Sequence, residues 1–248
     1  MGILLTIAYD GTDYCGWQQQ KNGLSVHAVL ENAIAPLLGA GQGFSLLGAS
    51  RTDAGVHALG QRVHLIASVP CPLPLHKMPL ALNSRLPADV RVLAASQVPD
   101  AFHPINDAKS KTYSYRIYNA RYQNPLSRRY TAFVPTPLDV EQMARAAQFF
   151  LGEHDFAAFC ASGSSVKSTV RRIYELSVTK DGPVVEIIAR GNGFLYNMVR
   201  IIAGTLTDVG AGKLAPQAIP EIIAGQKRTG AGKTMPPQGL VLIEVFYD

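Results

Sequence analysis

A run of small residues at positions 48–58, GASRTDAGVHA, contains one aspartate and one arginine that could take part in catalysis. Gly48 and Gly55 leave the backbone free to turn on either side of Asp53. The neighbours of Asp53 are small or apolar, and a carboxylate in such surroundings is costly unless it is paired. Arg51 is a local partner, and Arg200, from a predicted helix otherwise rich in apolar residues, is a second one.

Pairing with either arginine would keep Asp53 ionised, and an ionised carboxylate can act as a nucleophile or as a base. The alternative is an ordinary turn in which the aspartate accepts hydrogen bonds from its own backbone. The local sequence does not decide between these two interpretations.

Other motifs give no second candidate for catalysis. Residues 230–234, GAGKT, end like a phosphate-binding loop but lack its glycine spacing and its preceding strand, so a flexible polar loop is expected. The six histidines never pair at metal-ligand spacing on one predicted helix, and no cysteine lies beside a histidine as a nucleophile would. His57 could touch the site, but a structural role is the favoured interpretation. The sequence therefore predicts neither a metal nor a cofactor.

Composition indicates a well-packed globular protein. Of 248 residues, 47% are hydrophobic and 17% are charged. The first apolar run is too short for a signal peptide, and no apolar stretch approaches the length of a membrane span. Three cysteines, Cys15, Cys71 and Cys160, fit neither a disulfide framework nor a zinc site. We therefore expect a soluble, cytoplasmic protein without a membrane partner.

Positive charge is concentrated in the second part of the chain. Residues 1–100 hold six basic and six acidic residues, and the remainder holds seventeen and twelve. Six basic residues between 109 and 129 alternate with five tyrosines between 113 and 130. Basic groups neutralise phosphates and aromatic rings stack on bases, so this segment favours RNA binding. The alternative is a strand with tyrosines on one face and solvated charges on the other.

The hydrophobic pattern predicts two rough copies of a mixed unit, without strict alternation of strand and helix, which favours the α+β class. The expected units are residues 1–105, with the aspartate loop, and 106–248, with the tyrosine-rich strand and the Arg200 helix. We expect antiparallel-rich sheets joined around a central basic cleft. Strands are expected at 3–9, 44–47, 61–68, 90–93, 111–119, 172–179, 183–190 and 240–246, and helices at 26–38, 75–83, 138–152, 195–209 and 216–224.

Residues 48–58 resemble the signature of the TruA-type tRNA pseudouridine synthases, G-A-G-R-T-D-A-G-V-H-A. Weaker family motifs follow one another along the whole chain. They are YDGT (9–12), GWQQQ (16–20), LNSRLPADV (82–90), KTYSYRIYN (111–119), LGEHDF (151–156), VRRI (170–173), GFLYNMVR (193–200) and PQGL (237–240).

This resemblance implies an enzyme with the pseudouridine synthase fold that isomerises uridine to pseudouridine at positions 38, 39 and 40 of the tRNA anticodon stem-loop. It implies no cofactor and no metal, and a homodimer in which one tRNA contacts both subunits. Asp53 corresponds to the catalytic aspartate. Tyr113 corresponds to the tyrosine that packs against the target base, and Arg200 to the basic residue that pairs with the aspartate. Arg51, in the signature itself, is expected to bind substrate.

The sequence departs from the family pattern at three places. The segment FHPINDA (102–108) has Ile105 where the family usually has an arginine, so one RNA contact is expected to be lost or supplied elsewhere, for instance by Lys109. Ser50 replaces a glycine of the signature, and His27 replaces a common glutamine. These changes affect substrate contacts more than catalysis.

Three other functions compete with this one. The first is the same chemistry on another RNA. The second is a non-catalytic tRNA-binding protein, in which Asp53 would be dispensable. The third is a soluble α+β domain that never binds RNA.

Overall fold

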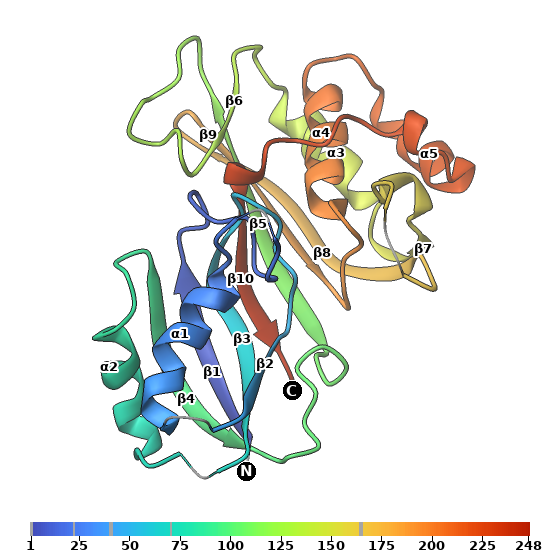
Figure 1. Cartoon of the computed structure of the whole chain (residues 1–248). Helices are drawn as coiled ribbons and strands as arrows, with labels where there is room; N and C mark the ends of the chain where they lie inside the picture. Colours follow the sequence, from blue (N-terminus) through green and yellow to red (C-terminus); the bar gives the residue numbers. More distant parts are fainter. Residues whose placement is uncertain (1, 22, 40–41, 70, 164–165) are drawn as a thin grey trace. The chain divides into compact units, whose positions relative to one another are not determined.

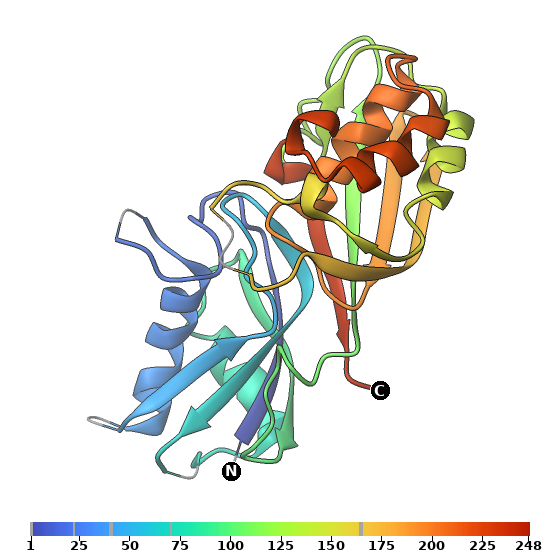
Figure 2. The ribbon, with the colours of Figure 1, turned by 90° about the vertical axis from the view of Figure 1, so that its right-hand side faces the viewer.

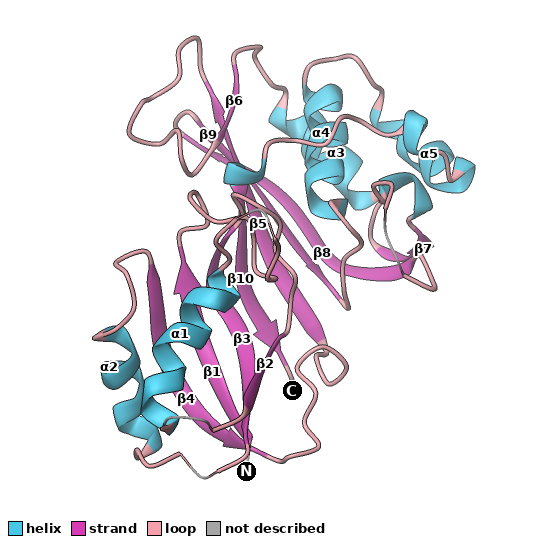
Figure 3. Ribbon diagram, in the orientation of Figure 1, coloured by secondary structure: helices cyan, strands magenta, loops and turns pink. Residues whose placement is uncertain are grey.

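The computed structural model describes residues 2–21, 23–39, 42–69, 71–163 and 166–248. These residues form two compact units, and both combine strands with helices (Figures 1 and 3). Unit 1 comprises Met1–Lys109 with Leu242–Asp248, and unit 2 comprises Ser110–Val241. The boundary after residue 105 between the two expected units stays a prediction.

Unit 1 is built on an antiparallel sheet. Its strands are β1 (Gly2–Tyr9), β2 (Phe44–Gly48), β3 (His57–Ala67), β4 (Val90–Val98) and most of β10 (Leu240–Phe246). The central strand β1 pairs with β3 on one side and β4 on the other, and β2 pairs with the second half of β3. β10 follows β3 in the strand order, and the carbonyl of Phe246 accepts a hydrogen bond from the Lys109 N–H at 2.8 Å.

Two helices accompany this sheet, α1 (Val26–Leu38) and α2 (Met78–Asn83), which follows a 3-10 turn at Leu75–Lys77. The side chain of Ser25 caps α1 by accepting a hydrogen bond from the Ala28 N–H at 3.1 Å. The buried positions of α1 recur every three or four residues, so they form one apolar stripe. Among the fully buried side chains of unit 1 are Leu30 and Ile34 of α1 and Leu5 and Ile7 of β1.

Unit 2 contains β5 (Ser110–Asn119), β6 (Ala132–Val134), β7 (Gly152–Asp155), β8 (Val170–Asp181) and β9 (Val184–Gly191). Their order is β6-β5-β9-β8-β7, with all pairs antiparallel except β5 with β6. The helices are α3 (Val140–Gln148), α4 (Met198–Gly210) and α5 (Ile219–Gly225). Figure 2 shows them gathered on one side of the unit 2 strands.

Helix α4 is buried around most of its circumference. Eleven of its residues are buried, Gly204, Thr205 and Gly210 among them. A helix that is buried on nearly all sides belongs to the protein core. Arg200 is the one basic residue of α4, so its position is fixed by the packing of this helix. No helix in the described ranges combines the length and the apolar character that spanning a membrane requires.

The mixed architecture with mostly antiparallel strands confirms the expected α+β class. Some element limits differ from expectation. β3 begins at His57 rather than at residue 61, and β4 extends to Val98 rather than ending at residue 93. α4 begins at Met198 rather than at 195, because Asn197 has left-handed backbone angles (φ 59°) that a helix cannot include. The short strands β6 and β7 were not predicted, since three or four residues carry too little periodicity.

Candidate active site

Asp53 lies in the loop that joins β2 to β3 in unit 1. Backbone groups of an earlier segment, residues 10–17, fasten this loop. Asp53 forms an isolated β-bridge with Gly16, and the Trp17 N–H donates to the Thr52 carbonyl at 3.0 Å. The Gly55 N–H donates to the Tyr14 carbonyl at 3.3 Å. The position of Asp53 is therefore set by main-chain contacts on both sides of it.

This bracing requires glycine in the earlier segment. A Cβ atom on Gly11 would lie 1.9 Å from the Val56 carbonyl oxygen, a distance that no side chain can tolerate. Gly16 has a φ of 108°, and a Cβ there would lie 2.6 Å from the Thr52 carbonyl oxygen. Gly55 has a positive φ of 75°, as the predicted turn requires. Gly48, which was expected to free the backbone in the same way, does not have a positive φ. Glycine fits there for another reason: the ring of Trp17 packs against it, 2.5 Å from where a Cβ atom would lie.

Hydrogen bonds of buried polar side chains also hold the loop in place. The Tyr9 and Thr52 hydroxyl oxygens lie 2.7 Å apart in a hydrogen bond. Gln61, which is fully buried, binds the backbone of Ser50 twice, since its Nε2 donates to the carbonyl at 2.6 Å and its Oε1 accepts from the N–H at 3.1 Å. These contacts link positions up to 43 residues apart, and local sequence patterns give no sign of them.

His57 has the structural setting that the sequence favours. It is buried, and its Nδ1 accepts a hydrogen bond from the Gly11 N–H at 3.0 Å and lies 3.1 Å from Oδ1 of Asp10. His57 therefore joins the segment at residues 10–17 to the start of β3. His27 is likewise tied into unit 1, with its ring edge-on to Trp17 at 5.7 Å.

Both charged residues of the loop are at least partly accessible to solvent. Asp53 is partly exposed and Arg51 is exposed, whereas Thr52 between them is buried. Both charged side chains can meet a substrate at the surface of unit 1.

Tyr113 lies in β5 of unit 2 and is 8% exposed. Its ring meets Phe194 edge-on, with centroids 5.3 Å apart. Tyr115, on the same face of the strand, is fully buried, and its hydroxyl donates to the Pro236 carbonyl at 2.7 Å. Burial raises the pKa of the Tyr115 phenol, and the nearby Arg200 charge only partly opposes that effect. The tyrosines of the basic segment therefore do not form one stacking surface, because Tyr115 belongs to the core.

Arg200 projects from α4 and is held within unit 2. Its Nε donates to the Met235 carbonyl at 2.7 Å, and its Nη1 donates to Oδ1 of Asn197 at 2.6 Å. The structure thus brings Arg51 and Asp53 together on one loop of unit 1, and Tyr113 and Arg200 onto the contacting elements β5 and α4 of unit 2. Pairing of Asp53 with Arg200 stays a prediction.

The loop at residues 120–131 of unit 2 carries several exposed basic and aromatic groups. Arg121, Arg128 and Arg129 are all exposed, and the guanidinium of Arg121 lies 5.3 Å from the ring centre of Tyr122. Lys109 and Ile105, where the family pattern is altered, are exposed in unit 1. Exposed cations of this kind can bind phosphate groups.

Two further features bear on cofactors. Among the described residues there is no cluster of three or more histidine, cysteine, aspartate or glutamate side chains that could hold a metal ion. The glycine-rich segment at 230–234 is a loop after a short 3-10 turn at Arg228–Gly230, and its Gly232 N–H donates to Oγ1 of Thr205 at 2.9 Å.

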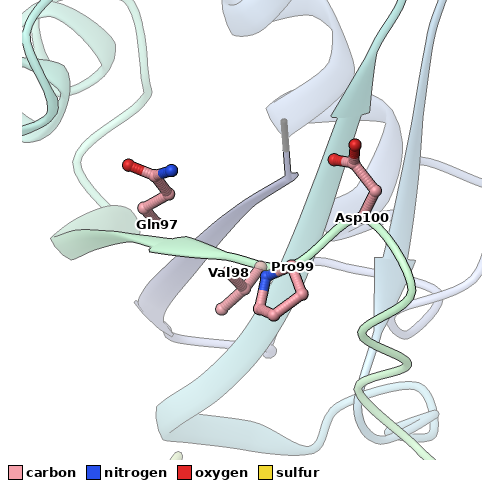
Figure 4. Close-up of a pocket in the computed structure, with 4 residues that line it drawn as sticks. All are labelled: Gln97, Val98, Pro99 and Asp100. Carbon is pink, nitrogen blue, oxygen red and sulfur yellow. The ribbon is translucent and has the colours of Figure 1, made fainter.

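A pocket in unit 1 is lined by Gln97, Val98, Pro99 and Asp100 (Figure 4). It lies where β4 ends, beside Gly2 at the start of β1, whereas the Asp53 loop contacts Tyr9 at the other end of β1. The pocket is thus separate from the candidate active site.

Comparison with known protein families identifies the class of protein to which this chain belongs. The family model described as tRNA pseudouridine synthase matches residues 5–106 and 146–248, which include Asp53 and Arg200. The chain belongs to this family. It is 48% identical to a tRNA pseudouridine synthase A of Caldicellulosiruptor bescii over 245 residues, which is 99% of both chains.

Other relatives carry the same name. A tRNA pseudouridine synthase A of Thermoanaerobacter sp. strain X514 is 46% identical over 245 residues, and that of Geotalea uraniireducens is 48% identical over 247, each with 99% of both chains covered. A chain from the crystal structure of a Cbf5–Nop10–Gar1 complex aligns with a TM-score of 0.42 and 12% identity, covering 97% of this chain and 48% of that one.

Proposed function

We propose that this protein is an isomerase that converts uridine to pseudouridine at positions 38, 39 and 40 in the anticodon stem-loop of tRNA. The observation that carries the proposal is the setting of Asp53. It is the aspartate of the signature motif, on a loop braced by main-chain hydrogen bonds, with its side chain partly exposed. Family membership and the names of the relatives supply the reaction class and the kind of RNA.

In this reaction the N1–C1′ bond of uridine breaks, the uracil turns and C5 bonds to C1′. C5 then loses its proton and N1 gains one, so that the product is an isomer of the substrate. A uracil inside a stem is inaccessible, and the nucleotide must first be flipped out. Asp53 then attacks C1′, attacks C6 or removes a proton from C2′. Tyr113 or Asp53 takes the C5 proton at the end.

The other site residues have roles that follow from their charge and shape. Tyr113 packs on the extruded base, as aromatic platforms do. Arg200 pairs with Asp53 and keeps it ionised, and Arg51 contacts the RNA beside it. Exposed Arg121 and Arg128 neutralise tRNA phosphates.

We also propose a cytoplasmic homodimer in which one tRNA contacts both subunits, and a reaction without cofactor or metal. Sedimentation of the protein with and without tRNA tests the dimer. Two subunits per tRNA support it, and a one-to-one complex of monomers contradicts it.

The decisive experiment compares Asp53→Asn with Asp181→Asn on unmodified tRNA, followed by detection of pseudouridine at each position. Asp181 is an exposed aspartate at the end of β8, which makes it a matched control. We expect no product from Asp53→Asn, nearly unchanged tRNA binding, and full activity from the control. Substantial product from Asp53→Asn would overturn the assignment.

The same assay separates the competing functions. Pseudouridine in another RNA but not in tRNA would indicate a different substrate. Binding of tRNA without product in the wild-type protein would indicate a non-catalytic tRNA-binding protein.

A further inference from the structure

Arg200 is bound from two directions by groups of its own unit. Asn197, three residues earlier, accepts from Nη1 at 2.6 Å, and the Met235 carbonyl accepts from Nε at 2.7 Å. The contact with Met235 is reciprocal, since the Met235 N–H donates to the Arg200 carbonyl at 3.2 Å. Two nitrogens of one planar guanidinium are thus fixed by acceptors on different segments, which sets the orientation of the plane.

Asn197 has an unusual position for this task. It directly precedes α4 with φ 59° and ψ 8°, a left-handed conformation that asparagine tolerates better than most residues. Asparagine at a helix N-terminus commonly caps the helix with its side-chain oxygen. Here the side chain makes no cap hydrogen bond, and its oxygen accepts from Arg200 instead.

The second acceptor lies on a segment packed tightly along α4, residues 232–236, which we name the strap. Gly232 donates its N–H to Oγ1 of Thr205 at 2.9 Å, and a Cβ on Gly204 would lie 1.9 Å from the Lys233 carbonyl oxygen. At the other end of the strap the Pro236 carbonyl accepts from the hydroxyl of Tyr115 at 2.7 Å. Met235 itself is 1% exposed. Its carbonyl is therefore held by contacts on both sides.

We propose that Asn197 and the strap are the positioning groups of Arg200 in the reaction, and this inference rests on the proposed function. A long, flexible arginine side chain loses conformational freedom when its charge must stand at one place. When the acceptors already hold the guanidinium, this conformational entropy is lost on folding and not during the reaction. Preorganised groups need no rearrangement as charge develops. Asn197 and Met235 themselves touch neither base nor ribose in this role.

The test uses two substitutions at Asn197. Asn197→Gly keeps the left-handed backbone without strain and removes the acceptor. Asn197→Asp keeps an oxygen acceptor, and aspartate also tolerates this backbone region. Gln226→Gly is the matched control, since Gln226 is the other non-glycine residue with a positive φ among those described, and its amide contacts Asp155 rather than Arg200.

We expect Asn197→Gly to slow single-turnover pseudouridine formation about tenfold, the size typical of one hydrogen bond to a charged group. The dissociation constant for tRNA should change less than about twofold, and the melting temperature should stay close to that of the wild type. Asn197→Asp should recover most of the rate, and Gln226→Gly should keep all of it.

A wild-type rate in Asn197→Gly, or an equal loss in the glycine and aspartate variants, would overturn the proposal. Should the glycine variant not fold, Asn197→Ala replaces it with the same expected loss of rate, because alanine also lacks the acceptor. If the wild-type protein makes no pseudouridine, the proposed function fails instead. A crystal structure of Asn197→Gly still decides the positioning: an Arg200 guanidinium displaced from the Met235 carbonyl supports it, and an unmoved one contradicts it.

Discussion

The backbone N–H of Gly11 donates a hydrogen bond to Nδ1 of His57, with 3.0 Å between the two nitrogens. This contact ties the turn after β1 to the first residue of β3, and the Asp53 loop lies immediately before that residue. The loop that carries Asp53 is thus supported by a buried histidine.

We predict that His57→Leu destabilises the protein by about 1–3 kcal/mol, because the buried Gly11 N–H is left without its acceptor. His57→Asn, whose Oδ1 can take the place of Nδ1, should lose clearly less. Urea denaturation at neutral pH measures both free energies of unfolding. Equal losses in the two variants would show that the ring contributes through packing alone.

Replacement of Tyr113 by phenylalanine should remove far more activity than tRNA affinity. The ring contact with Phe194 needs no hydroxyl, so the fold and the base-stacking surface persist. Single-turnover assays and tRNA binding measured on the same preparation make the comparison. Tyr122→Phe, at a tyrosine that is 72% exposed, is the control and should behave as wild type. Full activity of Tyr113→Phe would remove the hydroxyl from the mechanism.

Binding of tRNA should weaken steeply as salt concentration rises, because bound cations displace counterions from phosphates. A double substitution, Arg121→Ala with Arg128→Ala, should reduce the slope of log K against log salt by roughly 1–2. Lys180→Ala, at an exposed position near the end of β8, should leave the slope unchanged. A slope insensitive to the two arginines would place the RNA on another surface.

His64 should make stability depend on pH. It is fully buried in β3, and burial lowers the pKa of its imidazole from the ordinary value of 6.5, against the opposing charge of Asp100. Below pH 6.5 the unfolded chain binds a proton that the folded protein binds only at lower pH. The stability present above pH 6.5 is therefore lost as the pH falls toward the lower pKa of the folded state.

Urea midpoints between pH 8 and pH 5 measure this effect. His64→Leu should flatten the fall in stability below pH 6.5, whereas His76→Gln, at an exposed histidine, should leave it as it is. An unchanged pH profile in His64→Leu would assign the dependence to another group.

Sequence patterns predicted what is local in this structure. Helix α1 begins after its Ser25 cap as expected, because the cap and the apolar spacing lie within one stretch of chain. The turn at Gly55 was also predicted. The packing of Trp17 on Gly48 and the hydrogen bond between Tyr9 and Thr52 were not, since they join residues 31 and 43 positions apart along the chain.

The same limit applies to unit 2. Residues 113 and 115 share a face of β5, and α4 and the strap cover the second of them. The alternation of basic and aromatic residues could not separate this buried tyrosine from the exposed Tyr122. The left-handed Asn197 was missed for another reason, because asparagine is common in helices, turns and caps alike.

Unit 1 includes Leu242–Asp248, and this affects how the protein is made. On the ribosome, residues 1–109 emerge first, but the strand that lies next to β3 in the sheet is synthesised only after the whole of unit 2. At roughly 5–20 residues per second that interval is on the order of ten seconds. Throughout this interval, part of β3 lacks the strand that will lie beside it. The unpaired N–H and C=O groups of such an edge can pair with another chain.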